Sequence, residues 1–151
     1  MGMKVDCYVE QSSRAFRKKL RGIGYVLQCT INSVPFTITG MSAIDATEHA
    51  AELTAIVTAL DRMTKPADIT IHTADPYIRM TFNTISKLAE EGFTKANGSP
   101  MNNQALWIKF HEYSKLHNID VITGSHEYSS WIRTEIERRG LGGKEQNDIQ
   151  E

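Results

Sequence analysis

Cysteine is scarce in this chain of 151 residues, and long apolar runs are missing altogether. Its two cysteines, Cys7 and Cys29, form no C-x-x-C pair, which argues for reduced thiols and against a thiolate zinc site. No segment approaches the roughly 18 consecutive apolar residues of a membrane span, and residues 1–10 lack the apolar core of a signal peptide. We therefore expect a cytoplasmic protein that does not enter a membrane.

A charge excess of either sign is also missing. Seventeen basic and eighteen acidic side chains give a formal net charge of −1, so a nucleic-acid partner would have to be held by a local patch. One patch of this kind is present between residues 14 and 21, and it consists of Arg14, Arg17, Lys18, Lys19 and Arg21. Such a patch suits a phosphate backbone, although basic hairpin loops are often only solvated.

The chain shows no internal repeat and no linker, and its length suits one domain. We expect that domain to span residues 1–139 and to be monomeric. Residues 140–151 are rich in glycine and polar side chains, and we expect them to form a flexible tail.

Apolar periodicity predicts an α/β protein with five strands and four helices. The first three strands are separated by short connections and read as an antiparallel meander, whereas the later strands follow helices and should run parallel. The predicted strands cover residues 4–10, 23–31, 35–40, 68–73 and 119–123, and the predicted helices cover residues 47–60, 76–89, 103–117 and 129–139.

A carboxylate falls on the apolar face of the first predicted helix. At about 100° per residue, Glu52 lies between Ile56, Ala59 and Met63 rather than opposite them. Burying an unpaired carboxylate is costly, so Glu52 needs a partner. That partner can be an arginine or lysine, a hydrogen-bond network or a metal ion.

The order of the elements and the motif on the first helix resemble the type 1 ribonuclease H family over residues 4–139. Three shorter segments and one glycine add to the resemblance. The residues concerned are Thr47-x-x-x-x-Glu52-Leu53-x-Ala55-Ile56-Val57-x-Ala59-Leu60, Gly92-Phe93-Thr94, Gly98-Ser99-Pro100-Met101-Asn102-Asn103, Leu106-Trp107 and Gly24.

This resemblance implies a ribonuclease H-like α/β fold, with a mixed five-stranded sheet of three antiparallel and then two parallel strands flanked by helices. It also implies a hydrolase, an endonuclease that cleaves the RNA strand of RNA–DNA hybrids with two metal ions held by four carboxylates. Clustered carboxylates suit Mg²⁺, and Mn²⁺ is an alternative.

Two carboxylates align with the metal ligands of the family, and a third lies one residue from the matching position. Glu10 stands at the end of the first strand, where the family has an aspartate, and Glu52 takes the place of the family's helix glutamate. The family's Thr-Asp-x-x-Tyr motif corresponds to residues 73–77, in which Asp75 comes one residue late. Asp75 is therefore either the third ligand or only the N-cap of the next helix.

The fourth carboxylate of the family has no match, because Ser129 or Ser130 stands in its place. Glu127 in the preceding loop is a candidate substitute, and Glu135 lies further along the last helix. By resemblance, His126 is a catalytic residue for proton transfer or product release; the alternative is an exposed loop histidine. Thr47 corresponds to a phosphate-binding threonine, or serves as a helix N-cap.

Residues that read the RNA 2′-hydroxyls in the family are replaced by Glu48, His49 and Pro76. Glu48 is either a replacement metal ligand or a first-turn glutamate that favours the helix dipole. Because two of the four carboxylates are not matched in place, we expect reduced activity. The alternative is a catalytically degenerate module that binds nucleic acid or another partner. Trp107 and Trp131 are expected in the core.

Overall fold

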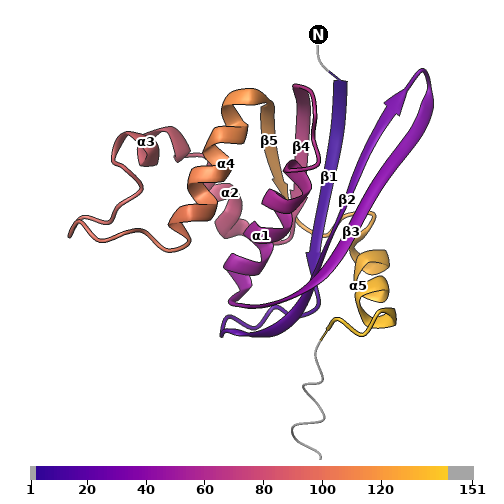
Figure 1. The fold of residues 1–151 in the computed structure, drawn as a ribbon, viewed down its shortest axis with the longest axis horizontal. Helices are drawn as coiled ribbons and strands as arrows, with labels where there is room; N and C mark the ends of the chain where they lie inside the picture. The colour runs from indigo at the N-terminus through magenta and orange to yellow at the C-terminus, as the bar shows by residue number, and fades with distance from the viewer. Residues whose placement is uncertain (1–2, 143–151) are drawn as a thin grey trace, which may run out of the picture.

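Five strands form one mixed sheet in the computed structural model, which describes residues 3–142. The strand order is β3-β2-β1-β4-β5, with β1 in the centre (Figure 1). Strands β1, β2 and β3 pair antiparallel, whereas β4 pairs parallel with both β1 and β5. The predicted fold class is confirmed. The bounds are Met3–Gln11 for β1, Lys19–Ile31 for β2, Val34–Ala46 for β3, Ala67–Thr73 for β4 and Asn118–Thr123 for β5.

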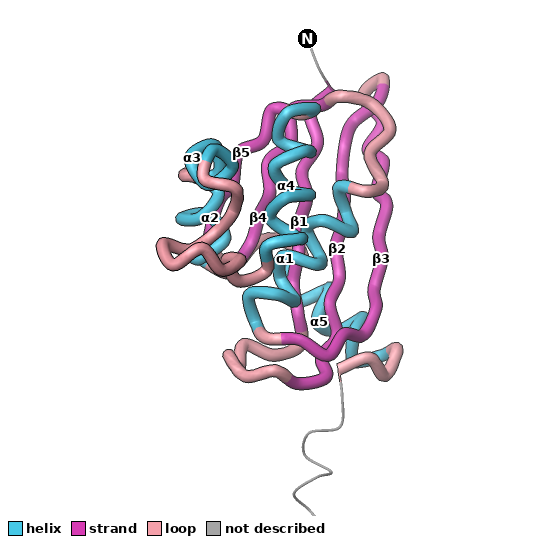
Figure 2. Tube along the Cα trace, turned by 60° about the vertical axis from the view of Figure 1, so that its left-hand side comes forward, coloured by secondary structure: helices cyan, strands magenta, loops and turns pink. Residues whose placement is uncertain are grey.

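Helices cover both faces of this sheet (Figures 1 and 2). Helices α1 and α4 lie on one face, where a large apolar core includes Cys7, Leu53 and Phe110. Helix α5 lies on the other face, over a smaller cluster that includes Tyr8 and Ile132. The bounds are Glu48–Leu60 for α1, Pro76–Phe82 for α2, Ile85–Glu90 for α3, Gln104–Leu116 for α4 and Ser129–Arg138 for α5.

The helix predicted over residues 76–89 is two short helices, α2 and α3. They are separated at Asn83 and Thr84, and the Thr84 hydroxyl donates to the carbonyl of Thr81 at 3.1 Å. A side chain that bonds to the backbone in this way competes with continued helix. Strand β3 also runs past its predicted end at Gly40, since its pairing with β2 continues without a break to Ala46.

The last residues of the described chain pack on the domain. Gly140 has φ of 71° just after α5, and Leu141 donates to the Ile136 carbonyl at 3.0 Å and packs on the smaller cluster. The rest of the predicted tail, residues 143–151, lies outside the described residues.

Two further findings concern the two cysteines and the lack of long apolar runs. Cys7 and Cys29 are both free, and burial, aided by the charge of Asp6, raises the pKa of the Cys7 thiol to about 12. Among residues 3–142, none of the helices has both the length and the apolar character needed to cross a bilayer.

Candidate active site

Four buried carboxylates come from three elements that meet at one edge of the sheet. Strands β1 and β4 are parallel, so their carboxyl ends lie together, and α1 begins beside them. The four residues are exposed by only 1–8%, a level that acidic residues rarely reach in proteins unless they are paired. They are Glu10 at the end of β1, Glu48 and Glu52 on α1, and Asp75 just after β4.

Arg14 lies among three of these carboxylates. Its Nη2 is 2.5 Å from Glu10 Oε2, and its Nη1 is 3.0 Å from Glu52 Oε1 and 3.5 Å from Glu48 Oε2. Burial alone would lower the pKa of Arg14, but the charges and hydrogen bonds of Glu52 and Glu10 outweigh it and raise that pKa. Of the partners considered for Glu52, the structure shows an arginine within a hydrogen-bond network.

Gln11 bonds directly to Glu52, and Arg21 bonds in turn to Gln11. The Gln11 side-chain amide donates to Glu52 Oε1 at 2.8 Å and to the Glu48 carbonyl at 3.0 Å. Its own oxygen accepts from Arg21 Nη1 at 2.8 Å, which fixes the orientation of the amide. Arg21 is 0% exposed and also donates to the carbonyls of Ser13, Ala15 and Arg17. Arg21 thus anchors the loop between β1 and β2, away from the surface where a phosphate would bind.

Asp75 has two hydrogen-bond partners. Its Oδ1 accepts from the backbone N–H of Tyr77 at 3.0 Å, so the predicted N-cap of α2 is confirmed. Its Oδ2 lies 2.6 Å from His49 Nδ1. Thr73 links this residue to α1, because its hydroxyl donates to Glu52 Oε2 and accepts from the Asp75 N–H.

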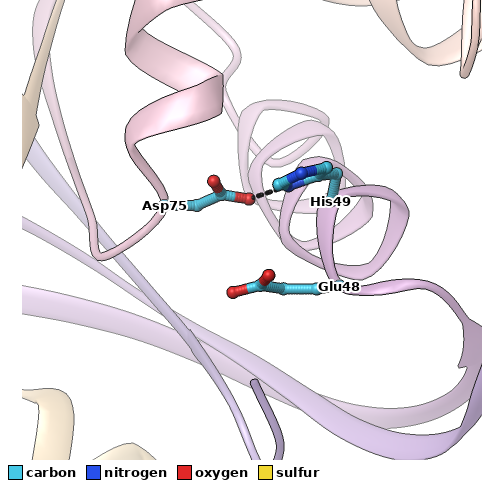
Figure 3. Close-up of side chains that lie close together, drawn as sticks. All are labelled: Glu48, His49 and Asp75. Atoms are coloured by element: carbon cyan, nitrogen blue, oxygen red, sulfur yellow. Dashed lines mark hydrogen bonds and ion pairs between the residues drawn. The ribbon is translucent and has the colours of Figure 1, made fainter. Parts of the chain in front are cut away.

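Figure 3 shows Glu48 and Asp75 projecting from α1 and from the start of α2 toward a common space, with His49 bonded to Asp75. The candidate ligand atoms of these three residues lie within 4.8 Å of one another. Within residues 3–142, they are the only group of three or more histidine, cysteine, aspartate or glutamate side chains that meets this distance.

A shallow groove opens beside this group. The His49 ring stacks on the Tyr77 ring with a centroid distance of 4.2 Å. The Phe16 ring lies 5.9 Å from the His49 ring, centroid to centroid, and Phe16 is 73% exposed. The groove is lined by Phe16, Thr47, His49, Tyr77, Asn102 and Asn103. Thr47 also caps α1, since its hydroxyl oxygen accepts from the Ala50 N–H at 3.4 Å.

His126 is held in place by two backbone groups. Its Nε2 lies 2.8 Å from the Val9 carbonyl, and its Nδ1 accepts from the Tyr128 N–H at 3.2 Å. These bonds fit a neutral ring that carries its proton on Nε2. Burial lowers the pKa of His126, although the Val9 carbonyl and Glu10 oppose this. The ring is half-buried rather than exposed in a loop.

Neither carboxylate considered as a fourth ligand joins the cluster. Glu127 accepts from the Tyr8 hydroxyl at 3.0 Å, and together burial and this bond raise the Tyr8 pKa. Glu135 pairs with Arg138 and Arg139 on α5. Glu48 is instead the fourth buried carboxylate.

The two tryptophans differ in environment. Trp107 is 0% exposed and stacks on Phe110, as predicted for a core residue. Trp131 is 42% exposed, so the prediction that it lies in the core is wrong. Its neighbour Ile132 takes the buried position on α5 instead.

Sequence reasoning assigned no role to Gln11, used Thr73 only to align the family motif, and placed Arg21 in the basic patch rather than behind the site. The signal for Gln11 was the alternation of the first strand, which puts it on the inward face with Cys7 and Val9. No local pattern marked Arg21 as an anchor of the loop, because its acceptors are backbone carbonyls of the preceding residues.

The family model for RNase H matches residues 3–124, which is most of the chain. The chain belongs to the ribonuclease H family. Among individual relatives, the ribonuclease H of Xanthomonas oryzae pv. oryzae (strain MAFF 311018) is 30% identical over 76 residues, 50% of this chain and 51% of the relative. Ribonuclease HI of Xylella fastidiosa (strain Temecula1 / ATCC 700964) is 31% identical over 78 residues, 51% of this chain and 52% of the relative. The chain thus matches about half the length of these ribonucleases H.

Solved structures of ribonuclease H proteins share the fold. LC9-RNase H1, described as a type 1 RNase H with the type 2 active-site motif, has a TM-score of 0.71 at 14% identity, covering 100% of this chain and 82% of its own. A foamy viral protease-reverse transcriptase in complex with RNA/DNA hybrid has a TM-score of 0.60 at 19% identity, covering 91% of this chain and 19% of its own. At such identities the likeness shows the fold alone.

Proposed function

We propose that this ribonuclease H-family chain is a metal-dependent endoribonuclease that cleaves the RNA strand of RNA–DNA hybrids. The observation that carries the proposal is the convergence of Glu10, Glu48 and Glu52 on one positive charge, the Arg14 guanidinium. Buried carboxylates that surround a cation form the kind of site that divalent metals occupy in hydrolytic enzymes.

The donor set fits a divalent metal. Carboxylate oxygens suit Mg²⁺, and the imidazole of His49, in the same cluster as Glu48 and Asp75, would also suit Mn²⁺. Glu10, Glu52 and Asp75 are the residues that we propose as metal ligands, with Glu48 as the fourth carboxylate. When bound, the metal would activate the attacking water and stabilise the leaving oxygen.

The chain's own residues prepare these carboxylates. Gln11 and Thr73 donate to the two oxygens of Glu52 and so fix the plane of its carboxylate. His49 Nδ1 bonds to Oδ2 of Asp75 and so helps to orient that carboxylate. Outer hydrogen bonds of this kind orient metal ligands, and their loss commonly costs about 10–100-fold in metal affinity or activity.

The nucleic-acid strand is proposed to lie across the loop between β1 and β2 and the groove beside α1. Arg14, Arg17, Lys18 and Lys19 lie in or next to that loop, and Thr47 lines the groove. The family relationship and the foamy viral structure, which contains an RNA/DNA hybrid, support this class of substrate.

The test is cleavage of an end-labelled RNA–DNA hybrid with Mg²⁺ and, separately, with Mn²⁺. We expect Glu52→Gln to reduce cleavage by more than about 100-fold, because a ligand matters at least as much as the groups that orient it. Glu112→Gln is the matched control, since Glu112 is exposed on α4, away from the site. It should cleave like the wild type.

Reduced activity is part of the proposal, because Ser129 or Ser130 stands at the family's fourth carboxylate. The Ser129 hydroxyl accepts from the backbone N–H of His126 at 2.9 Å. A folded wild-type protein that cleaves no hybrid with either metal would contradict the proposed function. Salt-dependent hybrid binding without cleavage would then indicate a degenerate nucleic-acid-binding module.

A further inference from the structure

Arg14 contacts the oxygens that a metal ion would need. Its two terminal nitrogens bond to Glu10 Oε2 and Glu52 Oε1 at 2.5 and 3.0 Å. We infer that Arg14 is a built-in competitor of the metal ion: it neutralises the carboxylates in the metal-free protein and moves out when the metal enters. This inference rests on the proposed function and adds a residue that sets the metal affinity of the site.

Competition follows from charge and from hydrogen bonding. Guanidinium–carboxylate bonds are among the strongest hydrogen bonds in proteins, so each must be given up when the same oxygen coordinates a metal. A divalent ion bound to Glu10 and Glu52 would also lie within a few ångströms of the guanidinium, where two positive charges repel strongly in a buried site. Arg14 and the metal therefore exclude one another.

The surroundings of Arg14 allow its side chain to move without unfolding the loop. The Arg14 side chain is 32% exposed, so it reaches the carboxylates from the solvent side. The loop backbone around it is anchored by Arg21, which donates to the carbonyls of Ser13 and Ala15 at 3.0 Å. The motion is thus a rotation of one long side chain, and not a rearrangement of the loop.

A displaced Arg14 would remain on the loop that carries Arg17 and Lys18, where it could contact a phosphate of the substrate. Arg14 then has two alternative anionic partners, the carboxylates without metal and the nucleic acid with metal. Because linkage is reciprocal, metal binding should strengthen hybrid binding, and hybrid should strengthen metal binding.

The experiment is calorimetric titration of the full chain with Mn²⁺ and with Mg²⁺, comparing the wild type with Arg14→Gln. We expect Arg14→Gln to bind the metal about tenfold more tightly or better, because one charged competitor has been removed. Lys18→Gln removes the same charge from the same loop without touching the carboxylates, and its metal affinity should stay within about threefold of the wild type.

Thermal unfolding provides a second measurement if Arg14→Gln is unstable. Without metal, the variant removes the Arg14 charge from Glu48 and Glu52 and leaves Glu10 with Arg133 at 3.4 Å, so it should melt below the wild type. Saturating Mn²⁺ should raise its melting temperature by more than that of the wild type, since tighter ligand binding stabilises the folded state more.

An Arg14→Gln variant that binds metal no more tightly than the wild type, with no larger thermal shift, would overturn the inference. If the wild type still bound metal and cleaved hybrid, the proposed function would stand. If neither protein bound metal and the wild type cleaved no hybrid, both proposals would fail.

Discussion

His117 and His126 each accept a backbone hydrogen bond through Nδ1, from Ala67 at 3.1 Å and from Tyr128 at 3.2 Å. Burial lowers the pKa of both rings. A protonated imidazole has no acceptor nitrogen, so protonation would break both bonds and place a charge in a partly buried position. The two residues therefore couple stability to pH.

We predict that the protein loses stability as the pH falls below about 6.5, the ordinary histidine pKa. Between this value and the lowered pKa of each folded ring, the unfolded chain binds protons at positions 117 and 126 that the folded chain binds less readily, so stability falls as the pH falls. Solvent screening of these partly exposed rings keeps the loss modest. Urea unfolding at pH 7.5 and pH 5.5 measures the effect.

In the same experiment, His126→Gln and His117→Gln should each lose less stability on acidification than the wild type. Glutamine can still accept the N–H through its amide oxygen but does not titrate. Identical pH dependence in the wild type and both variants would contradict the assignment.

Glu52 illustrates what single residues reveal in a sequence. Its burial was predictable, because helical periodicity is a local property of residues 47–60. Its partners were not, because Arg14 and Gln11 lie 38 and 41 residues away along the chain and meet it only after the sheet and α1 have packed. Local pattern thus identified the carboxylate but not the cation that accompanies it.

Helix α5 approaches β2 closely because two glycines, Gly22 and Gly24, lie under it. A Cβ atom at Gly22 would lie 2.3 Å from Ile136 Cγ2 and 3.1 Å from the Leu141 carbonyl oxygen. A Cβ atom at Gly24 would lie 2.7 Å from Ile132 Cγ2. The separations of 2.3 and 2.7 Å are shorter than Cβ contacts in proteins, and that of 3.1 Å is tight, so the α5 side chains or the helix itself would have to shift.

We predict that Gly22→Ala lowers the free energy of unfolding by about 1–3 kcal/mol, the usual cost of forcing an extra group into a packed interface. Urea denaturation followed by circular dichroism measures this. Gly142→Ala is the control, since a Cβ there would meet Ser12 at 3.5 Å, an ordinary contact. Equal stabilities of the two variants would show that α5 adjusts freely.

Among the elements, those with strong periodicity were predicted well. The three-stranded meander and α1, α4 and α5 occur where apolar spacing placed them. The segment over residues 76–89 kept a helical pattern across Asn83 and Thr84, and sequence spacing did not reveal the break, which depends on a side-chain bond to the backbone. Packing of Ile132 rather than Trp131 against the sheet likewise depended on the orientation of α5.

At the scale of the whole molecule, a net charge of −1 leaves binding of nucleic acid to a local group of cations. If the loop patch of Arg14, Arg17, Lys18 and Lys19 is that group, at most four phosphates are neutralised. We then predict that log K for hybrid binding falls with log salt concentration with a slope no steeper than about −4.

Lys18→Ala should reduce the magnitude of that slope by about 1, because one phosphate contact is lost. Lys65→Ala is a matched control, since Lys65 is exposed in the turn after α1 and is not part of the patch. Fluorescence anisotropy with a labelled hybrid at several salt concentrations measures the slope. Binding that does not respond to salt would contradict a role for the patch.

The central position of β1 has a consequence for how the protein is made. Strand β1 is synthesised before the other four strands, and it can pair with β4 only after the β2–β3 hairpin and α1 have followed. Pairings between distant segments form slowly, so the carboxylates on β1, α1 and the end of β4 are brought together late in folding. Arg14 follows Glu10 by four residues and leaves the ribosome with it. The nascent chain therefore carries its own counter-ion, and the acidic cluster can assemble before any metal ion is captured.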